Sequence, residues 1–496
     1  MGNVIGIDLG TTFSAVAHID ESGRPAIVLN DRGDNITPSC VAMHKGSLVV
    51  GEVARRTWGN DPDNAASRFK RDMGTSSTYA IASKEYTPTQ LSATLLKKLK
   101  EDTEEKIGPI DEVVVTIPAN FAQEAREATM EAATLAGLNV KYIINEPTAA
   151  ALYYAFQSDG NLSGTFAVFD LGGGTFDVSV IKVNGQDIDV VSSNGLNKLG
   201  GDDFDHVLWN LVADKYLKES GQPLTREDFP LNAAEEEKKS LSQRKRTTAE
   251  IERELVDLSR VEYEEAISSL VAQVEMMCEA TLDEAGIEPG DITKVFLAGG
   301  STRMPAITEC AKRVFKQDPI ATANVDEVVA LGAALYAAYK GDAENLTAIQ
   351  KQSVSKLTVT ETTNMCFGTI AMGYSESKGD TLVNSIIINK GEKIPCKITE
   401  SYYTVREGQT SIDCKITESK SAETNPKFVK EIWSGTLSLP ADRPTQQEVQ
   451  ITYSYDENQM MQASFKDMES GKETSISLAL GGEQRESSDI NKFLVD

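Results

Sequence analysis

Residues that bind transition metals are scarce in this chain. Its six cysteines form no CxxC pair, and its three histidines are far apart in the sequence. Structural zinc sites need such residues at short, regular spacings. We therefore expect free thiols and no zinc site. Cys396 and Cys414 leave one alternative open, since they could lie near each other on adjacent strands.

Long apolar runs are also missing. No stretch is long enough to cross a bilayer, and the N-terminus lacks the layout of a signal peptide, so we expect a soluble, cytoplasmic protein. Basic residues are outnumbered, with 49 Lys and Arg against 75 Asp and Glu and a formal net charge of -26. Because nucleic acids and anionic membranes attract basic surfaces, we expect neither nucleic acid nor membrane as a partner.

Two common nucleotide-binding motifs are absent as well. The chain has no Walker-type loop of the form GxxxxGK[ST] and no GxGxxG between a strand and a helix. It has instead two copies of another turn, IGIDLGTT at residues 5–12 and VFDLGGGTFD at residues 168–177. Each copy is an apolar run that predicts a buried strand, then an aspartate, then glycines that allow a tight turn.

Such a turn suits a phosphate group. Its backbone N–H groups can surround an anion, and an aspartate at the strand end can hold a cation through water. Either copy alone is also compatible with a simple hairpin, but the duplication favours a clamp around one magnesium nucleotide. A third strand that ends in paired glycines, VFLAGGSTR at residues 295–303, supports a nucleotide cleft.

These motifs resemble those of the DnaK-type heat-shock 70 chaperone family, within the actin and sugar-kinase ATPase superfamily. The resemblance continues through NEPTAAA at residues 145–151, LGGDDFD at residues 199–205 and VDEVVALGAA at residues 325–334. It implies an α/β fold with a duplicated, actin-like ATPase domain, followed by a small antiparallel β-sandwich that binds peptides. Over the last third of the chain the resemblance is mainly one of pattern.

Composition and periodicity divide the chain in the same way. Alternating strand and helix patterns over residues 1–340 predict the ATPase domain, in which the charged residues 234–255 indicate an exposed helix. Residues 341–360 are predicted as an interdomain linker. Alternating polar and apolar residues predict the β-sandwich over residues 361–485, and residues 486–496 would form a short tail without a helical lid.

The resemblance assigns the catalytic and metal-binding roles. It implies that the catalytic residues are Lys70, Glu146, Asp170 and Thr175. It implies that hydrated Mg²⁺, with K⁺ as a second candidate ion, is held by Asp8, Asp170 and Asp177. Without the resemblance, Lys70 would be a solvated surface lysine, and Glu146 an acidic residue at a helix N-terminus, where the helix dipole favours it.

The resemblance also places the nucleotide. It implies that ATP or ADP is bound by Gly10, Thr11, Thr12, Gly172, Gly173, Gly174, Gly200, Gly201, Glu235, Lys238, Lys239, Ser242, Gly299, Gly300, Ser301, Arg303 and Asp326. Lys239 departs from the family pattern, in which an arginine stacks on the adenine ring. Because an ammonium stacks less well than a planar guanidinium, we expect weaker nucleotide binding than is usual for the family.

Two further departures concern the client protein. The linker segment LTVTE at residues 357–361 has threonine at half of the positions where the family has leucines, so coupling between the domains is expected to be altered or weak. The short tail predicts fast, weakly held client binding, because a lid mainly slows dissociation. Tyr402 and Ile412 align with the peptide pocket of the family, and they are equally compatible with sandwich-core positions.

The leading hypothesis is an ATP-dependent chaperone of the stress response that hydrolyses ATP and binds extended hydrophobic segments of unfolded proteins. A J-domain co-chaperone and a nucleotide-exchange factor are implied as partners by the resemblance. The alternative is a nucleotide-regulated binding module or co-chaperone with little ATP turnover, which the altered linker favours. A small-molecule kinase is a third hypothesis, and the β-sandwich disfavours it.

Overall fold

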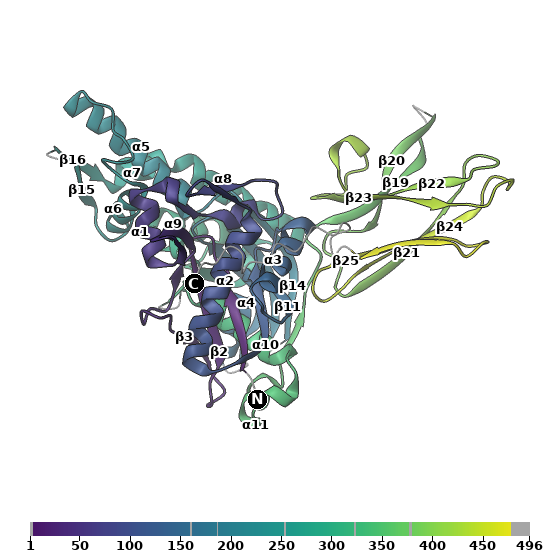
Figure 1. The fold of residues 1–496 in the computed structure, drawn as a ribbon, viewed down its shortest axis with the longest axis horizontal. Coiled ribbons are helices and arrows are strands. Elements are labelled where there is room, and N and C mark those ends of the chain that lie inside the picture. The colour runs from purple at the N-terminus through teal and green to yellow at the C-terminus, as the bar shows by residue number, and fades with distance from the viewer. Residues whose placement is uncertain are drawn as a thin grey trace. The chain divides into compact units, whose positions relative to one another are not determined.

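The computed structural model describes residues 3–158, 161–185, 187–251, 254–321, 324–375 and 379–477. The chain divides into two compact units (Figure 1). Among the described residues, unit 1 comprises 3–121 and 128–359, and unit 2 comprises 122–127 and 360–477. The predicted lidless tail lies outside the described residues.

Unit 1 is built on two large mixed sheets. The first has the order β11-β10-β1-β2-β3, with β4 paired to β2. Its strands are β1 (Asn3–Asp8), β2 (Phe13–Ile19), β3 (Pro25–Val28), β4 (Thr37–Pro38), β10 (Ile110–Ile117) and β11 (Val140–Asn145). The second has the order β17-β12-β13-β14-β18. Its strands are β12 (Ser163–Leu171), β13 (Phe176–Asn184), β14 (Asp187–Leu196), β17 (Ile292–Ala298) and β18 (Thr358–Thr360).

The two copies of the glycine turn occupy equivalent places in these sheets. Strand β1 runs parallel to β10 and forms an antiparallel hairpin with β2. Strand β12 likewise runs parallel to β17 and forms an antiparallel hairpin with β13. Each turn therefore connects the two strands of a hairpin whose first strand is held on its other side by a parallel neighbour.

Two helices pack between the sheets, α4 (Glu146–Gln157) against the second and α10 (Val328–Lys340) against the first. The helices also contact each other closely at Gly332, where a Cβ atom would fall 1.7 Å from the carbonyl oxygen of Ala149. Apolar residues of both sheets and both helices form one continuous core. This shared core fixes the strand ends of one sheet relative to those of the other, because protein interiors are closely packed.

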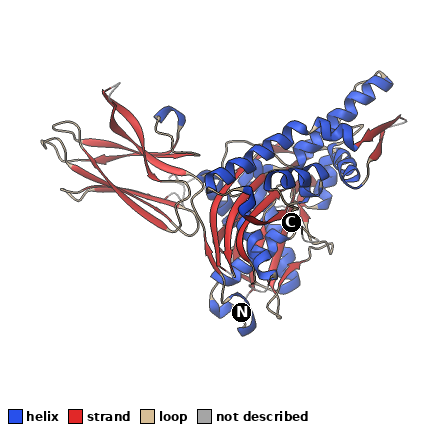
Figure 2. Ribbon diagram, turned by 180° about the vertical axis from the view of Figure 1, so that it is seen from behind, coloured by secondary structure: helices blue, strands red, loops and turns tan. Residues whose placement is uncertain are grey.

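Other helices lie around the two large sheets or against the smaller strands (Figure 2). They are α1 (Glu52–Asn60), α2 (Pro88–Ile107), α5 (Gly201–Ser220), α6 (Leu231–Gln243), α7 (Arg260–Ala266), α8 (Ser268–Ala285), α9 (Pro305–Phe315) and α11 (Ala348–Val354), together with α3 (Gln123–Leu135), whose first residues, up to Glu127, belong to unit 2. The 3₁₀ turns of unit 1 are η1 (Pro62–Asn64), η2 (Phe69–Asp72), η3 (Pro289–Asp291), η4 (Gly300–Arg303) and η5 (Ala343–Asn345). The smaller strands are β5 (Cys40–His44), β6 (Ser47–Val50), β7 (Ala65–Ser67), β8 (Tyr79–Ile81), β9 (Lys84–Tyr86), β15 (Arg246–Ile251) and β16 (Glu254–Ser259). Among the described residues, no helix is long and apolar enough to cross a membrane.

One predicted helix is only partly correct. The helix expected over residues 234–255 is α6, which ends at Gln243, and the chain then forms the antiparallel β15–β16 hairpin. In β15 the buried residues Ala249 and Ile251 are two positions apart, which is the period of a strand. The many charged residues of this segment favoured the prediction of one exposed helix, although Ala249 and Ile251 already alternate with polar residues.

The segment predicted as a linker is folded. It contains η5, α11 and β18, and its apolar residues Leu346, Val354 and Leu357 are buried in the core of unit 1. The side chain of Gln350 donates a hydrogen bond to the carbonyl oxygen of Ile19 at 2.6 Å. A few buried apolar side chains and one polar anchor therefore order a segment whose composition is that of a loop.

Unit 2 consists of two four-stranded antiparallel sheets with the orders β20-β19-β22-β23 and β21-β24-β25-β26. Their strands are β19 (Cys366–Ser375), β20 (Gly379–Ile388), β21 (Cys396–Tyr403), β22 (Ser411–Ser419), β23 (Lys430–Ser438), β24 (Glu448–Tyr455), β25 (Met461–Asp467) and β26 (Glu473–Ser477), with the 3₁₀ turn η6 (Pro426–Phe428) before β23. Strand β24 alternates buried and half-buried side chains along its length, as the sequence pattern predicts. Phe367, Ile416, Tyr453 and Phe465 are among the buried residues of the common core.

The sequence left open whether Cys396 and Cys414 of unit 2 lie on adjacent strands. Cys396 lies on β21 and Cys414 on β22, which belong to different sheets, so the adjacent-strand alternative is wrong. All six cysteines are free thiols.

Candidate functional site

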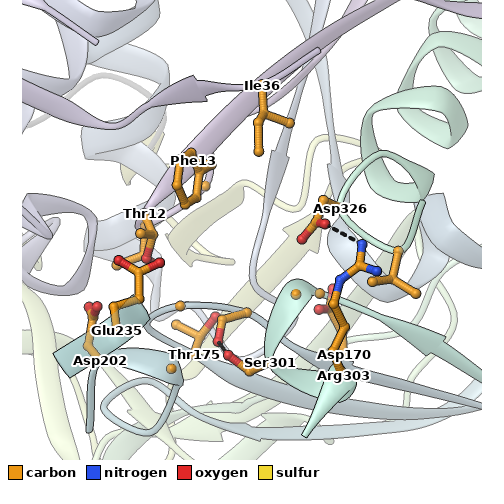
Figure 3. Close-up of a pocket in the computed structure, with 18 of the residues that line it drawn as sticks. Thr12, Phe13, Ile36, Asp170, Thr175, Asp202, Glu235, Ser301, Arg303 and Asp326 are labelled. Carbon is orange, nitrogen blue, oxygen red and sulfur yellow. Dashed lines mark hydrogen bonds and ion pairs between the residues drawn. The ribbon is translucent and has the colours of Figure 1, made fainter. Parts of the chain in front are cut away.

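A pocket of about 680 Å³ opens in unit 1 where strands β1, β12 and β17 end. The two glycine turns and the turn after β17 all contribute to its lining (Figure 3). The predicted residues that line it are Asp8, Gly10, Thr11, Thr12, Lys70, Glu146, Asp170, Gly172, Gly173, Thr175, Gly201, Glu235, Lys238, Lys239, Ser242, Gly299, Gly300, Ser301, Arg303 and Asp326.

The two glycine turns face each other. A Cβ atom on Gly173 would fall 1.7 Å from Oγ1 of Thr12, and one on Gly174 would fall 2.2 Å from Cγ2 of Thr11. Only glycine permits this approach, because any larger residue would collide with the opposite turn. The close contact brings the glycine backbone of the second turn against the threonine side chains of the first, which places N–H and hydroxyl groups together in an arrangement suited to binding phosphate oxygens.

Carboxylates from several elements gather beside these turns. Asp8 ends β1, Asp170 lies near the end of β12, Asp177 lies in β13, and Glu146 begins α4. Desolvation, followed by repulsion from Glu146, raises the pKa of Asp8 to about 7. The same causes raise the pKa values of Asp170 and Asp177 well above the usual range. The cluster therefore favours a nearby positive charge, which would let these carboxylates ionise.

Lys70 supplies one such charge. It comes from η2, is only 4% exposed, and forms an ion pair with the carboxylate of Glu146. Its ammonium also lies 5.9 Å from the ring centroid of Phe121. The alternative of a solvated surface lysine is therefore wrong, whereas Glu146 does stand at a helix N-terminus, as the sequence indicates.

The donor atoms fit a hydrated cation better than a directly ligated one. Among the described residues, no three Asp, Glu, His or Cys side chains converge as direct metal ligands. Carboxylate oxygens are nevertheless the ligands that Mg²⁺ prefers, and Mg²⁺ usually keeps several of its waters in proteins. The residues Asp8, Asp170 and Asp177 are therefore compatible with Mg²⁺ held through water.

Helix α6 and the turn after β17 form the other end of the pocket. Lys238 donates to the carbonyl oxygen of Gly201 at 3.0 Å and pairs with Asp205 at 2.7 Å. Lys239 instead pairs with Glu235 at 2.9 Å. In the turn after β17, Arg303 forms an ion pair of 2.7 Å with Asp326, drawn as a dashed line in Figure 3.

Some predicted residues lie outside the lining. Asp177, Gly174 and Gly200 are adjacent to it, and a Cβ atom on Gly200 would lie 2.5 Å from the backbone nitrogen of Gly174. The sequence interpretation missed the lining residues Phe13, Ile36, Asp202, Asp205, Gln243, Met304, Val325 and Val329. The position of Phe13 directly after the first turn could have indicated it, whereas no local signal singles out Ile36.

The two predicted client-binding residues lie in unit 2. Tyr402 and Ile412 are half-buried and pack against the core of that unit, and the Tyr402 hydroxyl donates to Ser385 at 3.0 Å. The core interpretation of both residues therefore fits their surroundings. Met372 and Leu382, which were not among the predicted residues, are cross-strand partners on β19 and β20 and are 47% and 56% exposed.

One comparison with known proteins bears on this arrangement. The family model described as Hsp70 protein matches residues 4–496 of the chain.

Proposed function

The chain belongs to the Hsp70 family, whose members are ATP-dependent chaperones, and we propose that it hydrolyses ATP in the pocket of unit 1 and binds extended hydrophobic segments of unfolded proteins in unit 2. The observation that carries the proposal is the meeting of two facing glycine turns with a buried lysine and a carboxylate cluster in one pocket. Phosphoryl transfer depends mainly on positioning and charge stabilisation, and this pocket offers both.

Hsp70 proteins bind ATP or ADP, typically with Mg²⁺. In our proposal the backbone N–H groups of the two glycine turns and the hydroxyls of Thr11 and Thr12 contact the phosphates. Asp8, Asp170 and Asp177 would hold Mg²⁺ through water, and the ion would neutralise phosphate charge. Helix α6 and the turn after β17 would contact the nucleoside, with Arg303 and Asp326 at its edge.

In this proposal Lys70 and Glu146 have different roles in the hydrolysis of ATP. A water molecule attacks the terminal phosphorus, the bond from that phosphorus to the bridging oxygen breaks, and ADP and phosphate are released. Glu146 orients the attacking water, and the ammonium of Lys70 stabilises the charge on the transferring group. Thr175 contacts the phosphate from the second glycine turn.

The exposed pair Met372 and Leu382 supports a client site on unit 2. Two adjacent apolar side chains on a β-hairpin expose a surface to which an extended hydrophobic segment can bind.

Hsp70 proteins typically also bind J-proteins and nucleotide-exchange factors, and we propose both as partners. We further propose that the chain is a specialised member of the family similar to the HscC branch, because of the pattern FKRDMG at residues 69–74. In this proposal, residues 357–361 alter the coupling between ATP hydrolysis and client binding.

Steady-state ATP hydrolysis, measured with and without an unfolded hydrophobic peptide, tests the proposal. An Asp8→Asn variant serves as the control for contaminating ATPase. Hydrolysis that requires Asp8 and rises with peptide is the expected result. Tight ATP binding without turnover would favour a regulatory module, and ADP production that depends on an added metabolite would favour a small-molecule kinase.

A further inference from the structure

Two arginines close to Lys70 in the sequence, Arg68 and Arg71, contact the first turn of α5. Arg68 adopts the left-handed conformation, with φ 66° and ψ 11°, which is unfavourable for a residue with a Cβ atom. Its guanidinium lies 4.6 Å from the centroid of the Trp58 ring, and its Nε lies 2.7 Å from Oδ2 of Asp202. Two contacts thus hold its side chain in one direction.

Arg71, on the other side of Lys70, contacts the next aspartate. Its Nη2 lies 2.5 Å and its Nη1 3.4 Å from the two carboxylate oxygens of Asp203. Asp203 in turn accepts a hydrogen bond of 2.8 Å from the backbone N–H of Gly200. Both aspartates belong to the first turn of α5, so η2 is attached to that helix at two points.

The first turn of α5 is itself joined to the second glycine turn. The backbone N–H of Gly201 donates to the carbonyl oxygen of Gly172 at 3.0 Å, and that of Asp202 donates to Gly173 at 2.8 Å. A continuous series of contacts therefore runs from the segment that carries Lys70 to the backbone that faces Thr12.

The aspartate of the ion pair between Arg68 and Asp202 is buried, unlike the carboxylate of a surface ion pair. Its side chain lines the pocket and the residue is only 3% exposed. Desolvation raises its pKa, and Arg68 opposes that shift more than any other neighbour does. Without Arg68, this buried carboxylate would lose the largest of the positive charges that compensate it and would keep only the weaker effects of Arg71 and Lys238.

We propose that Arg68 is a positioning residue, which through its ion pair with Asp202 fixes Lys70 relative to the second glycine turn and neutralises a carboxylate that lines the pocket. The inference rests on the proposed ATP hydrolysis, because its consequence is the alignment of Lys70 with the terminal phosphate. A small displacement of such a group affects the chemical step more than ground-state binding.

Arg68→Asn is the sharpest test, because asparagine tolerates the left-handed conformation while its short, uncharged side chain removes the guanidinium together with its contacts to Asp202 and Trp58. We expect the single-turnover rate of ATP hydrolysis to fall about tenfold, and the ADP affinity to change less than about threefold. In the nucleotide-free chain of 496 residues, amide hydrogen exchange of a peptide covering residues 199–205 should become faster. The double variant Arg68→Asn/Asp202→Asn should recover part of the rate, because it also removes the buried carboxylate whose main compensating charge is lost.

The matched control is Arg313→Gln, which breaks the ion pair of 2.6 Å between Arg313 and Glu275, outside the lining of the pocket. An unchanged exchange rate or an unchanged hydrolysis rate in Arg68→Asn would overturn the inference, as would an equal effect of the control. If the wild-type protein shows no hydrolysis that depends on Asp8, the proposed function fails. The exchange measurement then decides alone whether Arg68 fixes the first turn of α5.

Discussion

The ammonium of Lys70 and the carboxylate of Glu146 form a buried ion pair, although the residues are 76 positions apart in the chain. One comes from a 3₁₀ turn and the other from the first residue of α4. A buried pair is costly to desolvate, and removing one partner is more costly still. The pair therefore holds both side chains in place inside the pocket.

Lys70→Ala should lower single-turnover ATP hydrolysis by about 10²–10³-fold, because it removes a charge that stabilises the transition state. Nucleotide affinity should be largely retained, since the backbone of the glycine turns is unchanged. Rapid-quench measurement of ADP formation checks the rate. Lys198→Ala is the control, because Lys198 is an exposed lysine that contacts Asp72 of the same 3₁₀ turn at 3.7 Å. A near-normal rate in Lys70→Ala would refute the assignment.

Gly173→Ala should weaken ATP binding by about tenfold or more, because its Cβ atom would overlap Thr12 and push the two turns apart. Isothermal titration with ATP measures the effect. Gly290→Ala offers a matched control, since no atom lies within 4 Å of the Cβ position there. Equal affinities of the two variants would show that the close approach of the turns is not needed for binding.

Lys239→Arg should strengthen ADP binding by about three- to tenfold, because a guanidinium stacks on a planar ring better than an ammonium does. In the structure Lys239 is engaged with Glu235 and Glu236, each at 2.9 Å. Titration of ADP into the wild type and the variant checks the prediction. Unchanged affinity would mean that residue 239 does not stack on the base.

Leu382→Ser and Met372→Ser should each lower the affinity for an extended hydrophobic peptide by about threefold to tenfold, because each removes exposed apolar contact area. Fluorescence anisotropy of a labelled peptide measures the affinity. Met468→Ser changes another exposed methionine of unit 2, 41% exposed, and should have no effect. If all three variants bind peptide alike, the client site lies elsewhere.

Arg443→Gln should make the free energy of unfolding of unit 2 depend less on pH below about pH 4. Burial raises the pKa of Asp467, but hydrogen bonds from Arg443 and Ser470 outweigh it and lower the pKa to about 2. An unfolded aspartate titrates near pH 3.9, so the ionised carboxylate stabilises the fold above about pH 4, and this is lost as the pH falls toward about 2. Calorimetry should show a lower transition temperature for the variant at pH 7, and a smaller difference near pH 3. A difference that does not vary with pH would contradict the assignment.

Local patterns were enough for several parts of the protein. The glycines of both turns could be identified because a tight turn restricts which residues it accepts, and that restriction is visible in three or four consecutive residues. The alternation along β24 likewise identified a half-buried strand. In contrast, α11 and the β15–β16 hairpin were not predicted. Their polar or charged composition suggested a linker and a continuous helix, whereas a few buried apolar side chains stabilise the structures that form.

The sequence by itself determined the duplicated strand-and-turn motif, its aspartates and the alternation of strands in unit 2, because these follow from the backbone preferences of neighbouring residues. Only the tertiary structure decided that Gly173 contacts Thr12, that Lys70 is buried against Glu146, and that Arg68 reaches Asp202. The reason is that burial and close approach arise from the packing of distant segments around a shared core, and no local pattern encodes which segments will meet.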